Sequence, residues 1–128
     1  YIKNNTLPFS YLMNDSTPHF NVNAWFSSYQ SRQGINEGWC NYTPNHFHEL
    51  PYFISEYVKP DIFMAAVSPM DAEGYFTFGT AVVGNFEVME HARLIIVEEN
   101  ENMPATCGRT KVHISEVDYV CQSNHAFA

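Results

Sequence analysis

An apolar run between two prolines constrains the fold of this sequence more than any other feature. Residues 61–67 are almost entirely apolar, with Pro60 before the run and Pro69 shortly after it. A strand that is buried on both faces, as in a parallel sheet, has this pattern. Residues 94–97 form a second run of the same kind. The two runs therefore predict two strands of a parallel sheet, each buried on both faces.

Weaker patterns around these runs predict short helices. Apolar residues recur at helical spacing over 48–57, where Leu50, Phe53, Ile54 and Tyr57 would share one side, and Lys59-Pro60 would end the helix. A second helix is expected from Asn85, as its N-cap, to about residue 92. A third helix, ending at Gly34, is predicted from three aromatic residues near helical spacing: Trp25, Phe26 and Tyr29.

Short extended segments alternate with these helices. Strands are predicted at 19–24, 39–42, 112–114 and 117–120, and a strand or loop at 74–79. The alternation is typical of an α/β fold, here part of an open, mostly parallel sheet with flanking helices. Residues 1–18 have no clean period and are expected to form an irregular lead-in.

Composition excludes several classes of protein. The 128 residues are 45% hydrophobic and 16% charged, which fits one globular domain. Six Lys and Arg stand against 14 Asp and Glu, a formal net charge of −8 that disfavours binding to nucleic acid or to anionic lipid. No apolar run approaches the roughly 18 residues of a membrane span. We expect a cytoplasmic protein that binds neither nucleic acid nor membrane.

A histidine pair could bind a metal. His46 and His48 would point to one face of a strand, with Glu49 nearby. Alternatively, Glu49 opens a helix, where a carboxylate is favourable. No third histidine has a compelling position, so we expect no metal.

Two further groups could carry chemistry on residue type alone. An acidic cluster after the second apolar run is either a solvated turn or an acid/base site: Glu98, Glu99 and Glu101. A cysteine could act as a nucleophile beside a histidine, although reduced structural thiols are the expected state of all three: Cys40, Cys107 and Cys121.

The segment 68–76 follows the first apolar run directly. Ligands bind outside the carboxyl ends of the strands in open α/β sheets, and this segment begins at such an end. Asp71 and Gly74 also fit a turn, with Gly74 free to take a positive φ. A ligand-binding loop and a turn that leads into a hairpin are both consistent with the residues.

Residues 61–79 closely resemble the D(V/I)-apolar-VSPxDxxGYxSxG signature of the acetyl-CoA hydrolase/transferase family, which includes the 4-hydroxybutyrate and butyryl coenzyme A transferases. Further motifs occur in the same order. Arg32, Gly38, Tyr42, Pro44 and Glu49-Leu50-Pro51 are similar to R…(N)EG…YxPxxxxExP, 92–104 to AkxvIvEvNxnMP, and 112–120 to IHxSExDyxV. Two departures occur: Ala105 stands where many relatives carry arginine, and 80–90 diverges.

The resemblance implies a fold and a reaction. Members transfer coenzyme A between carboxylic acids or hydrolyse the thioester, through a glutamate that forms an acyl anhydride and then a glutamyl-CoA thioester. Coenzyme A would be a substrate, and no cofactor is implied. The enzyme would have two α/β lobes of the fold shared with ribose-phosphate isomerase, with the active site between them. A non-catalytic binding or assembly module is the alternative from a different class.

The length implies a fragment of such an enzyme. Residues 19–128 would form the later part of the first lobe, and the second lobe, which carries the catalytic glutamate, would be absent. The glutamates that occur in the recognised motifs all belong to the first lobe: Glu49, Glu73, Glu98 and Glu116. No catalytic residue is therefore expected in this chain. The expected partners are an acyl-CoA, a small carboxylate, the second lobe and further copies of the protein.

The resemblance places substrate-binding groups on the loops after three strands, where binding residues collect. Ser27 and Ser28 follow the first strand. Thr43, Asn45 and His46 follow the second. Ser68, Met70 and Asp71 follow the third.

Overall fold

The computed structural model describes residues 20–126, and the chain divides into two compact units, residues 1–47 and 48–128. The lead-in predicted for 1–18 and the start of the first predicted strand, His19, lie outside the described residues. No helix within 20–126 has the length and apolar character that crossing a membrane requires.

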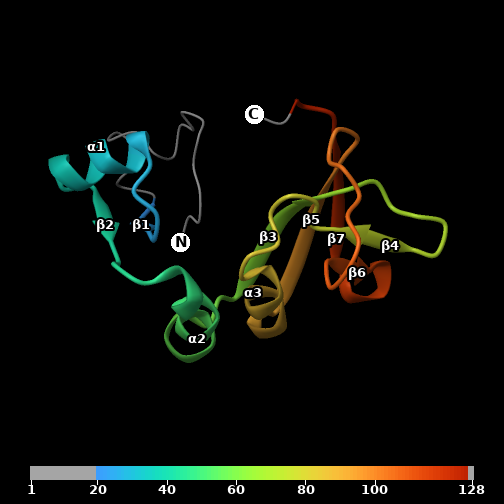
Figure 1. Ribbon diagram of the computed structural model, residues 1–128, viewed down its shortest axis with the longest axis horizontal. Coiled ribbons are helices and arrows are strands. Elements are labelled where there is room, and N and C mark those ends of the chain that lie inside the picture. The colour runs from blue at the N-terminus through green and yellow to red at the C-terminus, as the bar shows by residue number, and fades with distance from the viewer. Residues whose placement is uncertain (1–19, 127–128) are drawn as a thin grey trace. The chain divides into compact units, whose positions relative to one another are not determined.

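The first unit contains one parallel strand pair and one helix. Strand β1 (Val22–Ala24) pairs in parallel with β2 (Cys40–Tyr42), and helix α1 (Tyr29–Glu37) connects them (Figure 1). The core of this unit is Val22, Ala24 and Cys40, with Ile35 of α1 packed against it. Parallel pairing needs such a crossover, which explains why a helix separates the two short strands.

Helix α1 begins and ends later than the aromatic spacing predicts. Ser28 is the N-cap, and its Oγ accepts a hydrogen bond of 3.3 Å from the backbone N–H of Ser31. The predicted end at Gly34 is wrong, because the helix continues to Glu37 and ends at Gly38, whose φ is 86°. Gly34 instead permits a close approach, since a Cβ there would lie 2.7 Å from the ring of Trp39.

The second unit is built on a three-stranded parallel sheet. Strands β3 (Ile62–Val67), β5 (Leu94–Asn100) and β7 (Tyr119–Ser123) lie side by side in the order β3-β5-β7 (Figure 1). Helix α3 (Asn85–His91) lies between β3 and β5 in the chain and packs against β3. A separate antiparallel pair joins β4 (Tyr75–Thr77) to β6 (Lys111–His113). The predicted class, α/β with a mostly parallel sheet, is confirmed.

The apolar runs are buried on one face of this sheet, not on both as predicted. Phe63, Val67 and Val97 are buried in a core shared with Phe76, Phe78, Met89 and Val112. On β3, however, Ile62 is 52% and Met64 72% exposed. An apolar run shows that both faces of the strand are hydrophobic, but it does not show which element, if any, packs on each face. Among residues 20–126 the second face of β3 is left uncovered at these two positions.

The predicted helix over 48–57 is a composite of three helical types. A 3₁₀ turn η3 (Phe47–Glu49) leads into α2 (Leu50–Phe53) and then into a π-helical turn η4 (Ile54–Val58). Leu50 and Ile54 are buried as predicted, but Tyr57 is 67% exposed. The wider π turn breaks the α-helical spacing, and Tyr57 leaves the buried side for that reason.

The other boundaries differ by up to three residues, as where β5 continues to Asn100 and β7 to Ser123. Gly84, with φ 72°, is the N-cap of α3, so Asn85 is the first helical residue and not the cap. Its side-chain amide donates to the carbonyl of Ala81. Ile114 leaves the predicted strand to begin a 3₁₀ helix η5 (Ile114–Glu116).

The close approach at Gly34 predicts that replacing this helical glycine by alanine lowers stability, opposite to the usual effect. Gly→Ala within a helix normally stabilises by about 1 kcal/mol. Gly34→Ala should instead destabilise the protein by about 1 kcal/mol or more, because the methyl group overpacks against Trp39. Asn36→Ala, at an exposed position of the same helix, is the control and should stabilise by roughly 0.5 kcal/mol. Urea unfolding measures both; equal stabilisation would contradict the packing described.

Candidate functional site

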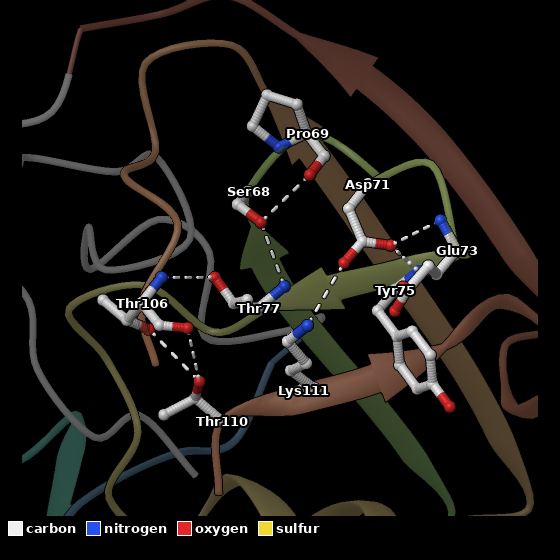
Figure 2. A network of polar contacts seen from close by, with 9 residues as sticks. All are labelled: Ser68, Pro69, Asp71, Glu73, Tyr75, Thr77, Thr106, Thr110 and Lys111. Atoms are coloured by element: carbon white, nitrogen blue, oxygen red, sulfur yellow. Dashed lines mark hydrogen bonds and ion pairs between the residues drawn. The ribbon is translucent and has the colours of Figure 1, made fainter. Parts of the chain in front are cut away.

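The loop after β3 is tied at its start by Ser68. This residue is 1% exposed, and its Oγ accepts a 3.0 Å hydrogen bond from the backbone N–H of Thr77 and donates one of 3.1 Å to the carbonyl of Pro69. The backbone N–H of Ser68 also donates to the carbonyl of Thr77, at 2.8 Å. Ser68 therefore joins the end of β3 to β4 (Figure 2).

Asp71 closes the turn that follows. Its Oδ1 accepts hydrogen bonds from the backbone N–H groups of Tyr75 (2.8 Å) and Glu73 (3.0 Å). Its Oδ2 lies 3.2 Å from Lys111 Nζ of β6. Gly74 has the expected positive φ, 85°. A turn is therefore present at the carboxyl end of a parallel strand. The predicted hairpin is wrong, because β4 pairs in antiparallel with β6, more than 30 residues further along the chain, and not with a neighbouring strand.

These contacts favour the ionised form of Asp71. The hydrogen bond from the Tyr75 N–H is the largest of the effects that lower the pKa of this carboxyl group. Partial burial opposes the decrease, while Lys111 and the Glu73 N–H add to it. Asp71 is thus an anion whose two oxygens are both engaged by the protein.

Met70 lies between Ser68 and Asp71, the two residues whose side chains bond the loop to the rest of the second unit. Its backbone N–H donates a 2.9 Å hydrogen bond to Glu99 Oε1, and its side chain is 47% exposed. Glu99 belongs to β5, where it is the register partner of Val67, the last residue of β3. From the sequence, Glu99 belongs to an acidic cluster and to the 92–104 motif but is not assigned to the site, and Lys111 is not singled out. The signal that could have found Glu99 is the register of the two apolar runs.

A threonine network secures the segment that returns from β5 to β6. The backbone N–H of Thr106 donates to Thr77 Oγ1 at 3.2 Å (Figure 2). Thr106 Oγ1 donates to the carbonyl of Gly79 at 3.3 Å. Thr110 Oγ1 donates to the Thr106 carbonyl at 3.1 Å. Ala105, at the position where many relatives carry arginine, is exposed on this segment. The departure therefore changes a surface position and leaves the core of the unit intact.

In the first unit, the predicted site residues lie on loops that leave one edge of the β1–β2 pair. Thr43 extends the pairing, since its N–H donates to the carbonyl of Ala24 at 3.0 Å. Ser28 caps α1, and the carbonyl of Ser27 accepts from the Arg32 guanidinium at 3.3 Å. His46 is exposed.

Asn45 differs from its neighbours on these loops. Its side-chain nitrogen is buried, and it finds no hydrogen-bond acceptor among the residues that the structure describes. A buried amide donor that is left unmatched costs on the order of 1–3 kcal/mol. Asn45 is therefore the residue of this group that is best suited to receive an acceptor oxygen.

The described residues give little support to a metal site or to a cysteine nucleophile. In the described part of the chain no three His, Cys, Asp or Glu side chains come together as metal ligands would. The three thiols are free: Cys40 is buried, while Cys107 and Cys121 are exposed. Burial raises the pKa of the Cys40 thiol, the opposite of what activates a nucleophile.

Comparison with known proteins adds the following similarities. A family model described as the acetyl-CoA hydrolase/transferase N-terminal domain matches residues 6–128. The chain is 40% identical over 118 residues to the succinyl-CoA:cyclohexane-1-carboxylate CoA transferase of Geobacter metallireducens, covering 92% of this chain and 27% of that protein. It is 37% identical over 108 residues to the 4-hydroxybutyrate coenzyme A transferase of Clostridium kluyveri, covering 84% and 25%.

The solved structures give the same result. The crystal structure of RipA from Yersinia pestis superposes with a TM-score of 0.81 at 32% identity, covering 90% of this chain and 29% of that one. A 4-hydroxybutyrate CoA-transferase from Porphyromonas gingivalis, at 23% identity, shares the fold with a TM-score of 0.64. The chain thus spans about a quarter of the length of the curated relatives that it matches.

The lowered pKa of Asp71 predicts a pH-dependent contribution to stability. A carboxyl whose pKa is lower in the folded state stabilises the fold above its unfolded pKa, near 3.9, and loses that contribution as the pH falls through the native value. Asp71→Asn should therefore lower the urea midpoint at pH 7 and progressively lose that effect as the pH falls through the native pKa of Asp71. Asp61→Asn, which removes an exposed carboxylate 4.0 Å from Arg93, should have little effect at pH 7. A constant Asp71→Asn deficit from pH 7 to pH 2 would contradict the assignment.

Proposed function

The chain belongs to the acetyl-CoA hydrolase/transferase family, and from that premise we propose that the complete protein moves coenzyme A between an acyl-CoA thioester and a small carboxylate. The observation that carries this proposal is the similarity, over most of the chain, to proteins that are named CoA transferases. A carboxylate of the acetate, butyrate or 4-hydroxybutyrate type is the proposed acceptor.

The proposed reaction uses a glutamate outside these 128 residues. Its carboxylate attacks the thioester carbonyl, the C–S bond breaks, and an acyl-glutamyl anhydride forms as the coenzyme A thiolate leaves. The thiolate then attacks the glutamyl carbonyl and releases the acyl group as a carboxylate. A second carboxylate attacks the resulting glutamyl-CoA thioester, and the same two steps in reverse return coenzyme A to the new acid. Covalent catalysis thereby divides one difficult exchange into easier steps.

In this proposal residues 19–128 are the later part of the first lobe and supply binding groups. The loops after β1, β2 and β3 are proposed to contact substrate through the predicted residues: Ser27, Ser28, Thr43, Asn45, His46, Ser68, Met70 and Asp71. Asn45 has support from its buried, unmatched amide nitrogen, which suits a carboxylate or carbonyl oxygen. Ser68 and Asp71 also shape the loop, because their side chains bond to the protein itself. A cytoplasmic location and homo-oligomeric assembly stay predictions.

The first test compares the complete gene product with the isolated chain. With butyryl-CoA and acetate, the complete protein should form acetyl-CoA, whereas residues 1–128 alone should form none, because the proposed nucleophile lies elsewhere. Incubation with butyryl-CoA and no acceptor should leave a coenzyme A adduct on one glutamate, detected by mass spectrometry. Release of free coenzyme A at the same rate with and without acetate would identify a hydrolase. Absence of both reactions would refute the proposal.

The second test concerns Asn45. In the complete protein Asn45→Ala should raise the KM for the carboxylate acceptor by about tenfold, the equivalent of roughly 1.4 kcal/mol and of one lost hydrogen bond. Asn41→Ala is the matched control, because Asn41 lies on β2 and its amide donates at 2.8 Å to Asn21 Oδ1 at the surface. Equal KM values for the two variants would remove Asn45 from the site.

A further inference from the structure

The four residues after β3 have unequal freedom. The side chains of Ser68 and Asp71 are engaged by backbone groups and by Lys111. Pro69 has a fixed backbone angle and no N–H. Met70 alone in this segment combines a backbone held by another strand with an apolar side chain that is 47% exposed. The segment therefore holds the backbone of one residue with an exposed apolar side chain at the carboxyl edge of the sheet.

The residue that holds Met70 comes from β5. Glu99 lies 29 positions further along the chain, and its Oε1 accepts from the Met70 N–H at 2.9 Å. Carboxylates form short, strong hydrogen bonds with N–H donors, and this bond does not depend on the Met70 side chain. Glu99 therefore fixes the position of the Met70 backbone, from which the side chain extends, through a bond to the backbone N–H alone.

The chemistry of the methionine side chain indicates which part of a substrate Met70 would contact. A thioether on an unbranched chain adapts to irregular apolar surfaces and offers no strong hydrogen bond. At the carboxyl edge of a parallel sheet, where ligands bind, it would contact the apolar part of a substrate. In the proposed reaction that part is the hydrocarbon chain of the acyl group, since the carboxylate and thioester ends are polar.

We infer that Met70 contacts the acyl chain and that Glu99 is a positioning residue for this contact, so that the pair sets the preference for longer over shorter acyl groups. The inference rests on the proposed coenzyme A transfer. It adds to that proposal a residue, Glu99, that no motif assigned to the site, and a role for Met70 in selecting acyl groups by their length.

The test measures chain-length preference in the complete gene product, with acetyl-CoA, butyryl-CoA and hexanoyl-CoA as donors. Met70→Ala should raise the ratio of the butyryl-CoA KM to the acetyl-CoA KM by about tenfold, the scale of a methylene contact in an apolar pocket, with the change in KM and not in kcat. Glu99→Ala should move the same ratio in the same direction. Glu99→Gln should restore the wild-type ratio, because the amide Oε1 still accepts from the Met70 N–H.

Glu101→Ala is the matched control. It removes the same charge from an exposed position two residues further along the chain, and it should leave the chain-length ratio unchanged. A Glu99→Ala variant that loses kcat equally with all three donors, or that Glu99→Gln does not rescue, would overturn the positioning role.

The remaining outcomes distinguish a failure of this inference from a failure of the proposed coenzyme A transfer. An unchanged ratio in Met70→Ala, in an active protein, would overturn the acyl contact alone. If Glu99→Ala does not fold, Met70→Ala still decides, because a half-exposed side chain can be removed with little effect on the fold. A wild-type protein that transfers coenzyme A from none of the three donors would overturn the proposed function itself.

Discussion

The parallel pairing of β3 with β5 is the constraint on which the second unit depends. Six register pairs, from Ile62 with Leu94 to Val67 with Glu99, align the two strands so that both end at the same edge. Parallel pairing requires a long crossover, and residues 68–93 supply it with β4 and α3. One side of the pair packs on Phe76, Phe78 and Met89, which come from that crossover. The segment that forms the candidate loop also supplies the core that holds the strands.

Local sequence patterns predicted this pair but not how it is covered. The run at 61–67 is apolar and flanked by prolines, which is sufficient to identify a strand and to favour parallel pairing. Exposure of Met64 could not be predicted, because it depends on which elements reach each face. The same limit explains Gly34, whose role is a contact with Trp39 rather than a helix end. Tyr57 shows a further limit, since a π turn changes the spacing on which the prediction relied.

The sequence predicted the loop that carries the candidate site but not the contacts that hold it. Ser68, Met70 and Asp71 follow the end of β3, as the apolar run predicts, and their role in binding stays a prediction. The residues that hold this loop lie 29 and 40 positions away, at Glu99 and Lys111. Such pairs follow from strand register, and one residue of slip would turn Glu99 to the other face of the sheet. No local pattern contains that information.

The contacts of the loop also suggest why its polar residues occur in a family signature. The loop begins at a buried residue, and a buried backbone N–H without an acceptor costs about 1–3 kcal/mol. Ser68 satisfies the N–H of Thr77, and Asp71 satisfies those of Glu73 and Tyr75, so both side chains meet needs of the backbone itself. These residues are sufficient to build a rigid edge, and nothing in their contacts requires a reaction. The polar residues of the signature therefore describe a turn of the second unit, and the exposed side chain of Met70, which makes none of these hydrogen bonds, is left for the proposed contact with substrate.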